Sequence, residues 1–234
     1  MKNIYKLITT SILLKALTII LVMSFGADVY ALPEGGVITA GGASINSGST
    51  RTTITQTTQN AAINWQSFNI GQKETVQFMQ PNSLSVALNR VLGSNPSIIL
   101  GSLSANGKVF LIIPNGVLFG KGAQVNVGGL VASTLNITDS DFMAGTYKFT
   151  GAGDGMILNQ GSISSDGGYV ALLGATVSNE GIISAKLGTV VLAAGNAFTL
   201  DVVGDGLLNV TVNQGAVYAL AQNGGLIKAD GGQV

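Results

Sequence analysis

Short apolar runs separated by glycine-containing turns recur between residues 100 and 134. Four of these runs are Val109–Ile113, Val117–Phe119, Val125–Val127 and Leu130–Ala132. Each run is too short for a typical helix and is rich in β-branched or other apolar residues, so the pattern predicts strands. Asn-Gly and Gly-Gly pairs between the runs supply the tightly bent residues that turns require.

The same pattern of apolar runs and glycine-containing turns recurs along the chain. Counterparts of the segment that begins at Gly101 begin at Gly161, Gly181 and Gly225, and an earlier copy covers Gly36–Ile45. Asn159 and Asn179 are also equivalent, 20 residues apart. A repeat of this length predicts a solenoid whose equivalent residues stack about 4.8 Å apart. Stacked asparagines can form amide ladders.

A coil of this size leaves little space inside. Twenty residues at about 3.3 Å each give a perimeter of roughly 66 Å, which Val, Leu and Ile side chains fill. We therefore expect the interior to be packed core and any function to lie on the outside or at the ends.

Five segments depart from the repeat or leave the type of element open. Asn46–Gln59 is rich in Thr, which favours a polar edge strand or cap over a linker. Lys73–Gln80 alternates as a half-buried strand, and Ser83–Leu92 fits either a helix or a strand. Thr138–Gly155 predicts a protruding hairpin or pair of loops anchored by aromatic residues, and Val212–Ala221 a short helix or external strand.

The N-terminus has the pattern of an export signal. Lys2 and Lys6 precede a mostly apolar stretch, and small residues stand at positions −3 and −1 of a site between Ala31 and Leu32. We expect residues 1–31 to be a signal peptide that is cleaved there, and residues 32–234 to form one domain. A retained membrane anchor is the alternative.

The amino-acid composition excludes several kinds of catalytic and binding chemistry. The 234 residues include no Cys and no His, and 11 basic residues balance 11 acidic ones. Thiol chemistry, disulfides and Ser-His or Cys-His catalysis are therefore excluded, and nothing indicates a nucleic-acid partner. Asp139, Asp141 and Asp154 suggest a calcium site only weakly, because the motif is not repeated. We expect no metal and no cofactor.

Two stretches carry a resemblance to a known family. They are residues 63–91 (INWQSFNIGQKETVQFMQPNSLSVALNRV) and residues 101–134 (GSLSANGKVFLIIPNGVLFGKGAQVNVGGLVAST). Their ordered motifs resemble the N-terminal secretion (TPS) domain of two-partner-secretion exoproteins, the filamentous-haemagglutinin-like proteins and high-molecular-weight adhesins of Gram-negative bacteria. The resemblance implies an all-β, right-handed parallel β-helix, three-sided, with an N-terminal cap and extra-helical antiparallel strands.

Two motifs of the family are altered in this chain. Its Asn-Pro-Asn-Gly-Ile turn stands here as Ile113-Pro114-Asn115-Gly116-Val117, so the first Asn is replaced. Its Asn-Pro-Asn-Leu motif is matched only in part, at Asn95-Pro96-Ser97. These differences place the chain nearer the high-molecular-weight-adhesin branch.

The resemblance also implies a function and a set of partners. The expected role is secretion targeting of a longer adhesin- or haemagglutinin-like exoprotein, exported by the Sec machinery. Its partner would be the POTRA domains of an outer-membrane TpsB-type transporter, followed by release or surface display, where a missing C-terminal part would contact a host glycan or receptor. A polysaccharide-acting β-helical enzyme, a stand-alone carbohydrate-binding adhesive module and an autotransporter passenger are the alternatives.

The candidate recognition residues fall into two groups. The first is the turn motif with its neighbours: Ile113, Pro114, Asn115, Gly116, Val117, Phe119 and Gly120. The second comprises cap residues with a candidate partner contact: Asn64, Trp65, Phe68, Asn89 and Arg90. Turn geometry and cap packing are the alternative roles for both groups.

Overall fold

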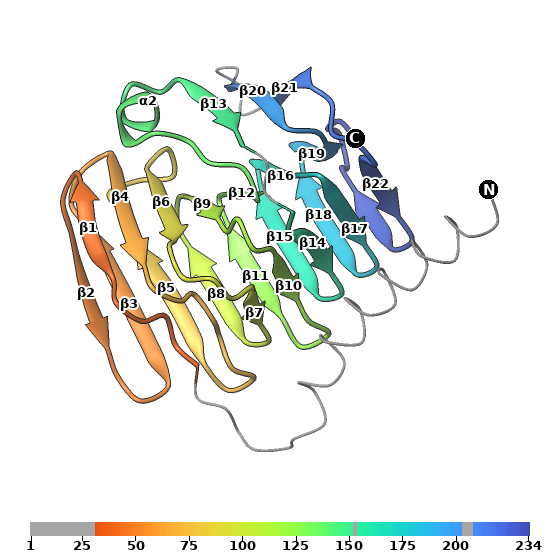
Figure 1. Ribbon diagram of the computed structural model, residues 1–234. Helices are drawn as coiled ribbons and strands as arrows, with labels where there is room; N and C mark the ends of the chain where they lie inside the picture. Colours follow the sequence, from red (N-terminus) through yellow and green to blue (C-terminus); the bar gives the residue numbers. More distant parts are fainter. Residues whose placement is uncertain (1–30, 152–153, 203–207) are drawn as a thin grey trace.

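The computed structural model describes residues 31–151, 154–202 and 208–234, so most of the predicted signal peptide lies outside the described residues. The described chain winds into a parallel β-helix built from three sheets, and a fourth, smaller sheet lies outside it (Figure 1). The solenoid and its all-β composition confirm the expected fold class.

The strands of the three sheets pair with their neighbours in the following order. The seven-stranded sheet contains β1 (Val37–Ala40), β4 (Asn60–Trp65), β6 (Val86–Val91), β9 (Lys108–Ile112), β12 (Gly129–Ser133), β16 (Tyr169–Gly174) and β19 (Thr189–Ala194). The five-stranded sheet contains β22 (Leu220–Asn223), β17 (Thr176–Asn179), β14 (Met156–Asn159), β10 (Val117–Phe119) and β7 (Ser97–Ile99). The eight-stranded sheet contains β2 (Ala43–Ser47), β3 (Arg51–Gln56), β5 (Thr75–Met79), β8 (Ser102–Ala105), β11 (Gln124–Val127), β15 (Ser162–Asp166), β18 (Ile182–Lys186) and β23 (Leu226–Lys228).

One turn of the helix visits the three sheets in succession. From β9 the chain passes through β10 and β11 and returns to the seven-stranded sheet as β12, which pairs with β9 in parallel. The register is continuous, because Leu130 lies beside Val109 on one side and Val170 on the other, and Val170 lies beside Val190. Residues 20 to 22 apart therefore stack where no insertion intervenes, close to the predicted 20-residue repeat.

Glycines let the coils approach closely at one corner. A Cβ atom added at Gly181 would lie 2.2 Å from the carbonyl oxygen of Gly161, and one added at Gly225 would lie 2.1 Å from that of Gly181. These distances are too short for any side chain. The three repeat copies are therefore aligned one above another, and glycine is required where their backbones meet.

Three asparagines form a ladder beside this corner. Asn159 Nδ2 donates to Asn179 Oδ1 over 2.7 Å, and Asn179 Nδ2 donates to Asn223 Oδ1 over 2.6 Å. Asn159 and Asn179 are fully buried, whereas Asn223 is exposed at the last coil. Each buried amide is thus satisfied by the neighbouring coil, which confirms the predicted ladder.

The interior of the helix is apolar. Branched aliphatic residues from every coil and the aromatic rings of Trp65, Phe68, Phe78 and Phe119 form one buried cluster. Hydrophobic burial inside each coil therefore supplies the main stabilisation, and the interior holds side chains instead of a binding cavity.

The N-terminal end is closed by antiparallel strands. Strand β1 pairs antiparallel with β4, and β2 forms an antiparallel pair with β3. Asn46–Gln59 forms part of the predicted cap: it contains β3, which pairs with both β2 and β5, so the edge strand of this sheet is β2. The reading of Gly36–Ile45 as a first solenoid copy is wrong, because these residues reverse direction to cover the end of the parallel sheets, which would otherwise expose unpaired backbone groups.

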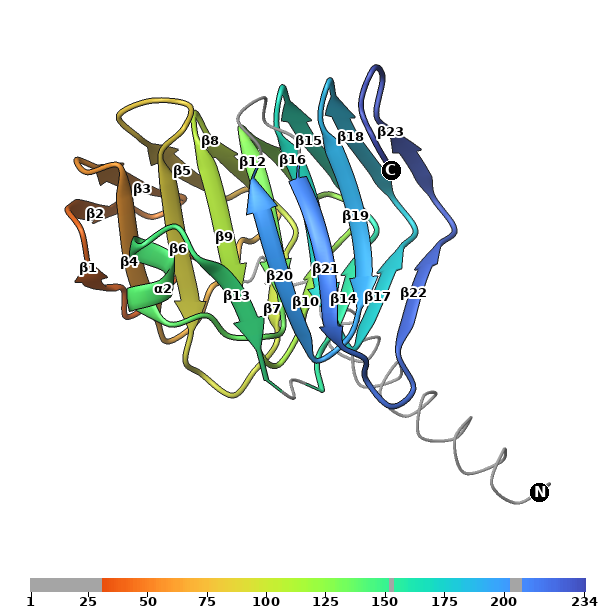
Figure 2. The same ribbon diagram turned by 90° about the horizontal axis from the view of Figure 1, so that it is seen from above.

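Extra-helical elements cover the outside of the seven-stranded sheet. Helix α2 (Asp139–Met143) and strands β13 (Tyr147–Thr150), β20 (Ala197–Val202) and β21 (Leu208–Gln214) lie over it in Figure 2. They bury a second apolar cluster in which Phe110 contacts Phe142, Tyr147 and Phe149.

The structure resolves the segments whose type the sequence left open. Aromatic anchoring of Thr138–Gly155 is confirmed, but the segment contains the short helix α2 in addition to a strand. Ser83–Leu92 holds the strand β6. Val212–Ala221 contains the end of the external strand β21 and the start of β22, which rejoins the solenoid.

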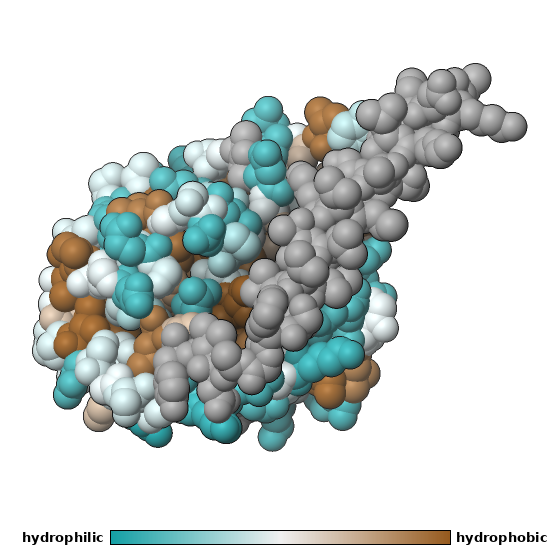
Figure 3. All heavy atoms as spheres, turned by 60° about the horizontal axis from the view of Figure 1, so that its bottom comes forward, coloured by the Kyte–Doolittle hydropathy of each residue, from teal (hydrophilic) through white to brown (hydrophobic). Residues whose placement is uncertain are grey.

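On the face shown in Figure 3, hydrophobic residues are interspersed with hydrophilic ones. Among the described residues, no helix has the length and hydropathy needed to cross a bilayer.

The asparagine ladder yields a test of the fold. Replacing Asn179 with Ala removes hydrogen bonds to both neighbouring coils and leaves the buried Asn159 amide without its acceptor, so we expect the free energy of unfolding to fall by about 1–3 kcal/mol. Asn223→Ala at the exposed end is the matched control and should cost less. Urea unfolding measures both variants, and equal losses would contradict a structural role for the buried ladder.

Candidate functional site

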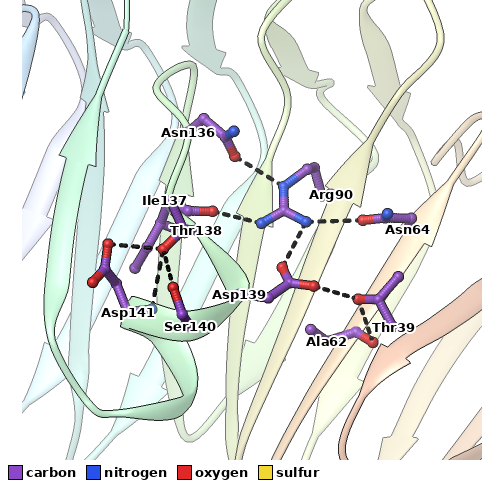
Figure 4. A network of polar contacts seen from close by, with 10 residues as sticks. All are labelled: Thr39, Ala62, Asn64, Arg90, Asn136, Ile137, Thr138, Asp139, Ser140 and Asp141. Carbon is purple, nitrogen blue, oxygen red and sulfur yellow. Dashed lines mark hydrogen bonds and ion pairs between the residues drawn. The ribbon is translucent and has the colours of Figure 1, made fainter.

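Arg90 gathers the polar residues on the outside of the cap. Its guanidinium donates to the side-chain oxygens of Asn64 (2.9 Å) and Asn136 (2.8 Å) and to the carbonyl oxygen of Ile137, and it forms an ion pair with Asp139 at 2.8 Å (Figure 4). We call these five residues the cap cluster. It joins β4 and β6 to the segment that carries α2, because arginine presents several donors in a fixed plane.

Asp139 extends the cap cluster to the first strand. Thr39 on β1 donates its hydroxyl to Asp139 Oδ2 over 2.7 Å. Burial raises the pKa of Asp139, but the hydrogen bonds from Thr39 and Arg90 and the positive charge of Arg90 outweigh it, so the pKa lies below its usual value. The carboxylate is therefore held in its charged form.

The other cap candidates lie inside the molecule. Trp65 and Phe68 are buried and meet edge to face at 5.6 Å, and Trp65 Nε1 donates to Asn89 Oδ1 over 2.9 Å. Asn89 is itself fully buried. In the folded chain these three residues are buried beneath the cap. Of the five cap candidates, only Asn64 and Arg90 reach the outer surface.

The turn motif is mostly buried as well. Ile113 and Val117 belong to the interior, whereas Pro114 is half-buried and Asn115 exposed. Gly116 N–H donates to Ile113 O over 2.9 Å, which closes a β-turn with Pro114 at its second position. Pro114 and Asn115 are therefore the parts of this turn that remain accessible after folding.

Gly116 occupies a position that only glycine tolerates. Its φ is +95°, and a Cβ atom there would lie 2.6 Å from the carbonyl oxygen of Met156 on the next coil. Farther along the same coil, Phe119 is fully buried, and a Cβ atom at Gly120 would lie 2.5 Å from Leu100 Cδ2. Backbone geometry thus accounts for Gly116 and packing for Phe119, whereas the neighbour of Gly120 is the movable end of a leucine side chain.

A short loop links the turn to the cap. Asn115 Nδ2 donates to Gly93 O over 2.8 Å, and Gly93 belongs to the loop that follows β6, the strand of Arg90. In the same loop, Leu92 N–H donates to Trp65 O over 2.8 Å. The two groups of candidates therefore occupy successive coils at one corner, between the seven- and five-stranded sheets.

The acidic residues considered for calcium have other contacts. Asp139 pairs with Arg90, and Asp141 accepts a hydrogen bond from the Thr138 hydroxyl at the start of α2. Within residues 31–151, 154–202 and 208–234, no three His, Cys, Asp or Glu side chains are grouped in a way that would hold a metal ion.

Comparison with known families decides the identity of this fold. A family model described as the TPS secretion domain matches residues 30–234. The chain belongs to the TPS secretion domain family. This membership makes it a secretion-targeting domain, and a TPS domain implies a cognate outer-membrane TpsB transporter as its partner.

Relatives of this TPS domain come from Haemophilus influenzae. A Heme/hemopexin-binding protein is 38% identical over 229 residues, which cover 92% of this chain but 25% of the relative. A second protein with this name is 50% identical over 98 residues, which cover 42% of this chain and 11% of the relative. The chain thus spans about a quarter of the length of the first relative.

Solved structures show the same fold. The HMW1 secretion domain of Haemophilus influenzae superposes with a TM-score of 0.76 at 36% identity, over 86% of this chain and 54% of that one. A filamentous hemagglutinin secretion domain superposes with a TM-score of 0.55 at 16% identity, over 83% of this chain and 73% of that one, and supports the fold alone. Both structures are described as secretion domains.

The sequence predicts Arg90 and Asn64 as candidates, but not the other three residues of the cap cluster. Asp139 stands out in the sequence only as a weak calcium candidate, and no pattern marks Asn136, Ile137 or Thr39, which donates to Asp139. Arg90 and Asp139 are 49 residues apart in the sequence, so no local pattern links them.

The Asp139 carboxylate predicts a specific acid sensitivity. Because its pKa is lowered on folding, its contribution to stability is fully present above the ordinary value of 3.8 and is lost as the pH falls through the lower folded pKa. Asp139→Asn should therefore destabilise the domain at neutral pH, and the difference from wild type should shrink near pH 2. Urea unfolding at both pH values measures this.

Asp201→Asn is the matched control, because it removes the same charge from an exposed site on β20. It should change stability little at either pH. If wild type and Asp139→Asn have the same free energy of unfolding at neutral pH, the cap cluster does not stabilise the domain as proposed.

Proposed function

We propose that this TPS domain directs a longer adhesin- or haemagglutinin-like exoprotein through its transporter and begins the folding of that exoprotein outside the cell. The observation that carries the proposal is the match of residues 30–234 to the TPS secretion domain family. The relatives in which this domain forms only a quarter of the chain support a longer exoprotein. TPS exoproteins are secreted by Gram-negative bacteria to the surface or the extracellular space.

The proposed route has two membrane steps. The Sec machinery exports the chain, and cleavage between Ala31 and Leu32 releases it into the periplasm. The POTRA domains of the TpsB transporter then bind it by strand pairing while its sheet edges are still open. The chain crosses the outer membrane and folds outside.

The burial of the turn motif supports recognition before folding is complete. Ile113, Val117 and Phe119 contribute to the interior of the folded helix, so a transporter can contact their side chains only before the coil closes. Asn115 is accessible in both states. We therefore assign first contact to the unfolded turn, with Asn115 as its polar determinant.

The cap cluster supports a second stage, in which folding starts at the N-terminal coils. Arg90 fastens β6 and the strand pair β1–β4 to the segment that contains α2. This closes the end of the helix and leaves the opposite end ready to pair with further coils, because each coil is the template for the next. Binding of a host glycan or receptor would then belong to the rest of the exoprotein.

Secretion of an Asn115→Ala variant tests the proposal. Co-expressed with its cognate transporter, this variant should be released into the medium severalfold less than wild type. The mutation removes the hydrogen bond that Asn115 donates to Gly93 O, so the free energy of unfolding should fall by only about 0.5–1.5 kcal/mol. Immunoblots of medium and periplasm give the release, and urea unfolding gives the stability.

The matched control is Asn106→Ala, at the other Asn-Gly corner of the same coil. Asn106 is also exposed and braces the preceding coil through two hydrogen bonds to Gln80, so its loss should cost at least as much stability. Near-normal release of this control, beside poor release of Asn115→Ala, is expected. If both variants are released like wild type, Asn115 has no recognition role.

A further inference from the structure

Glu74 is a buried carboxylate at the start of β5 that lies against the first residue of the described chain. Its side chain is almost fully buried. One oxygen accepts a hydrogen bond from the Gly71 N–H over 2.7 Å, and both oxygens lie 3.0 Å from the backbone nitrogen of Ala31. The carboxylate thus connects the corner between β4 and β5 to the N-terminal segment.

The surroundings of the Glu74 carboxylate suit a charged hydrogen-bond donor better than a neutral one. Both are backbone amides, and the structure shows no ion pair between Glu74 and another described residue. A buried carboxylate without a cation is costly. In addition, the single hydrogen of the Ala31 amide is shared by two oxygens at equal distance, whereas an ammonium group has three hydrogens to offer.

Cleavage between Ala31 and Leu32 would create such an ammonium group nearby. This step rests on the proposed function, which includes that cleavage. The new α-amino group lies on Leu32, which directly follows Ala31; consecutive Cα atoms are about 3.8 Å apart, so the new terminus forms close to the nitrogen that Glu74 now holds. It replaces a neutral amide by a positive charge beside the same carboxylate.

The following residues keep the new terminus in place. Leu32 packs against the interior cluster, and Pro33 is buried. Glu34 then exchanges backbone hydrogen bonds with the segment after β4, because its N–H donates to Ser67 O over 3.0 Å and its carbonyl accepts from Gln66 N–H over 2.9 Å. The terminal amino group therefore has little freedom to leave the region of Glu74.

We propose that Glu74 is the binding site for the α-amino group of Leu32, and that removal of the signal peptide completes the N-terminal cap by forming this ion pair. The processed chain then gains a contact that no N-terminally extended chain can make. Cap closure is thereby coupled to processing, so the export precursor has a weaker cap than the exported domain.

Chemical modification of the terminal amine tests the proposal. We compare the processed chain beginning at Leu32 with its Glu74→Gln variant, using acetic anhydride at neutral pH and mass spectrometry of the N-terminal peptide, with lysines as internal reference. A nearby carboxylate favours the protonated, unreactive amine, so the wild-type α-amino group should react about tenfold more slowly than that of the variant. Equal rates would overturn the proposal.

Stability supplies a second measurement. Each chain is also prepared with a Gly-Ser extension before Leu32, and the four melting temperatures form a double-mutant cycle. Glu74→Gln should lower the melting temperature more in the chain that starts at Leu32 than in the extended chain. An equal decrease in both would show that Glu74 only braces the Gly71 corner, and would overturn the proposal.

Two controls keep the outcomes separate. If the variant does not fold, the wild-type chain alone decides, because its α-amino group must react faster in urea than in the folded state. Sequencing of the exported N-terminus identifies the cleavage site. A terminus other than Leu32 would contradict both the predicted cleavage and this inference, whereas cleavage at Leu32 with an unprotected amine would contradict the inference alone.

Discussion

The parallel stacking of successive coils is the interaction on which the rest of this structure depends. At the corners, backbones approach so closely that Gly181 and Gly225 leave no room for a side chain, and beside them the buried amides of Asn159 and Asn179 satisfy each other. A coil displaced by one residue would lose these contacts and turn its apolar side chains outward. The strand register, the apolar core, and the glycine and asparagine contacts at the corners therefore depend on one another.

This constraint also decides where function can lie. Because each coil is filled by its own side chains, recognition is left to the corners, the ends and the elements added outside. The turn at Ile113–Val117 and the loop after β6 lie at the corner between the seven- and five-stranded sheets, and both insertions, α2–β13 and β20–β21, leave the helix there. Arg90 connects one of these insertions, the one that carries α2, to the cap.

The regular part of this architecture could be predicted from the sequence, because a 20-residue repeat specifies stacking of like residues. The period does not specify strand direction at the end of the stack, and the antiparallel β1 was therefore misread as a first coil. Helix α2 is too short to show a helical period. The contacts of Arg90 with Asp139, and of Glu74 with Ala31, join residues more than 40 positions apart, and no local pattern reveals them.

Disulfide trapping tests the stacked register most directly, because the chain contains no cysteine of its own. Ser164 and Ser184 lie side by side on β15 and β18, at a separation of about 4.8 Å expected for paired strands, which suits a disulfide. Ser164→Cys with Ser184→Cys should therefore oxidise to an intramolecular disulfide. Ser164→Cys with Ile182→Cys, offset by two residues, should not. Efficient bonding of the offset pair, or none in the aligned pair, would contradict the stacking of these coils.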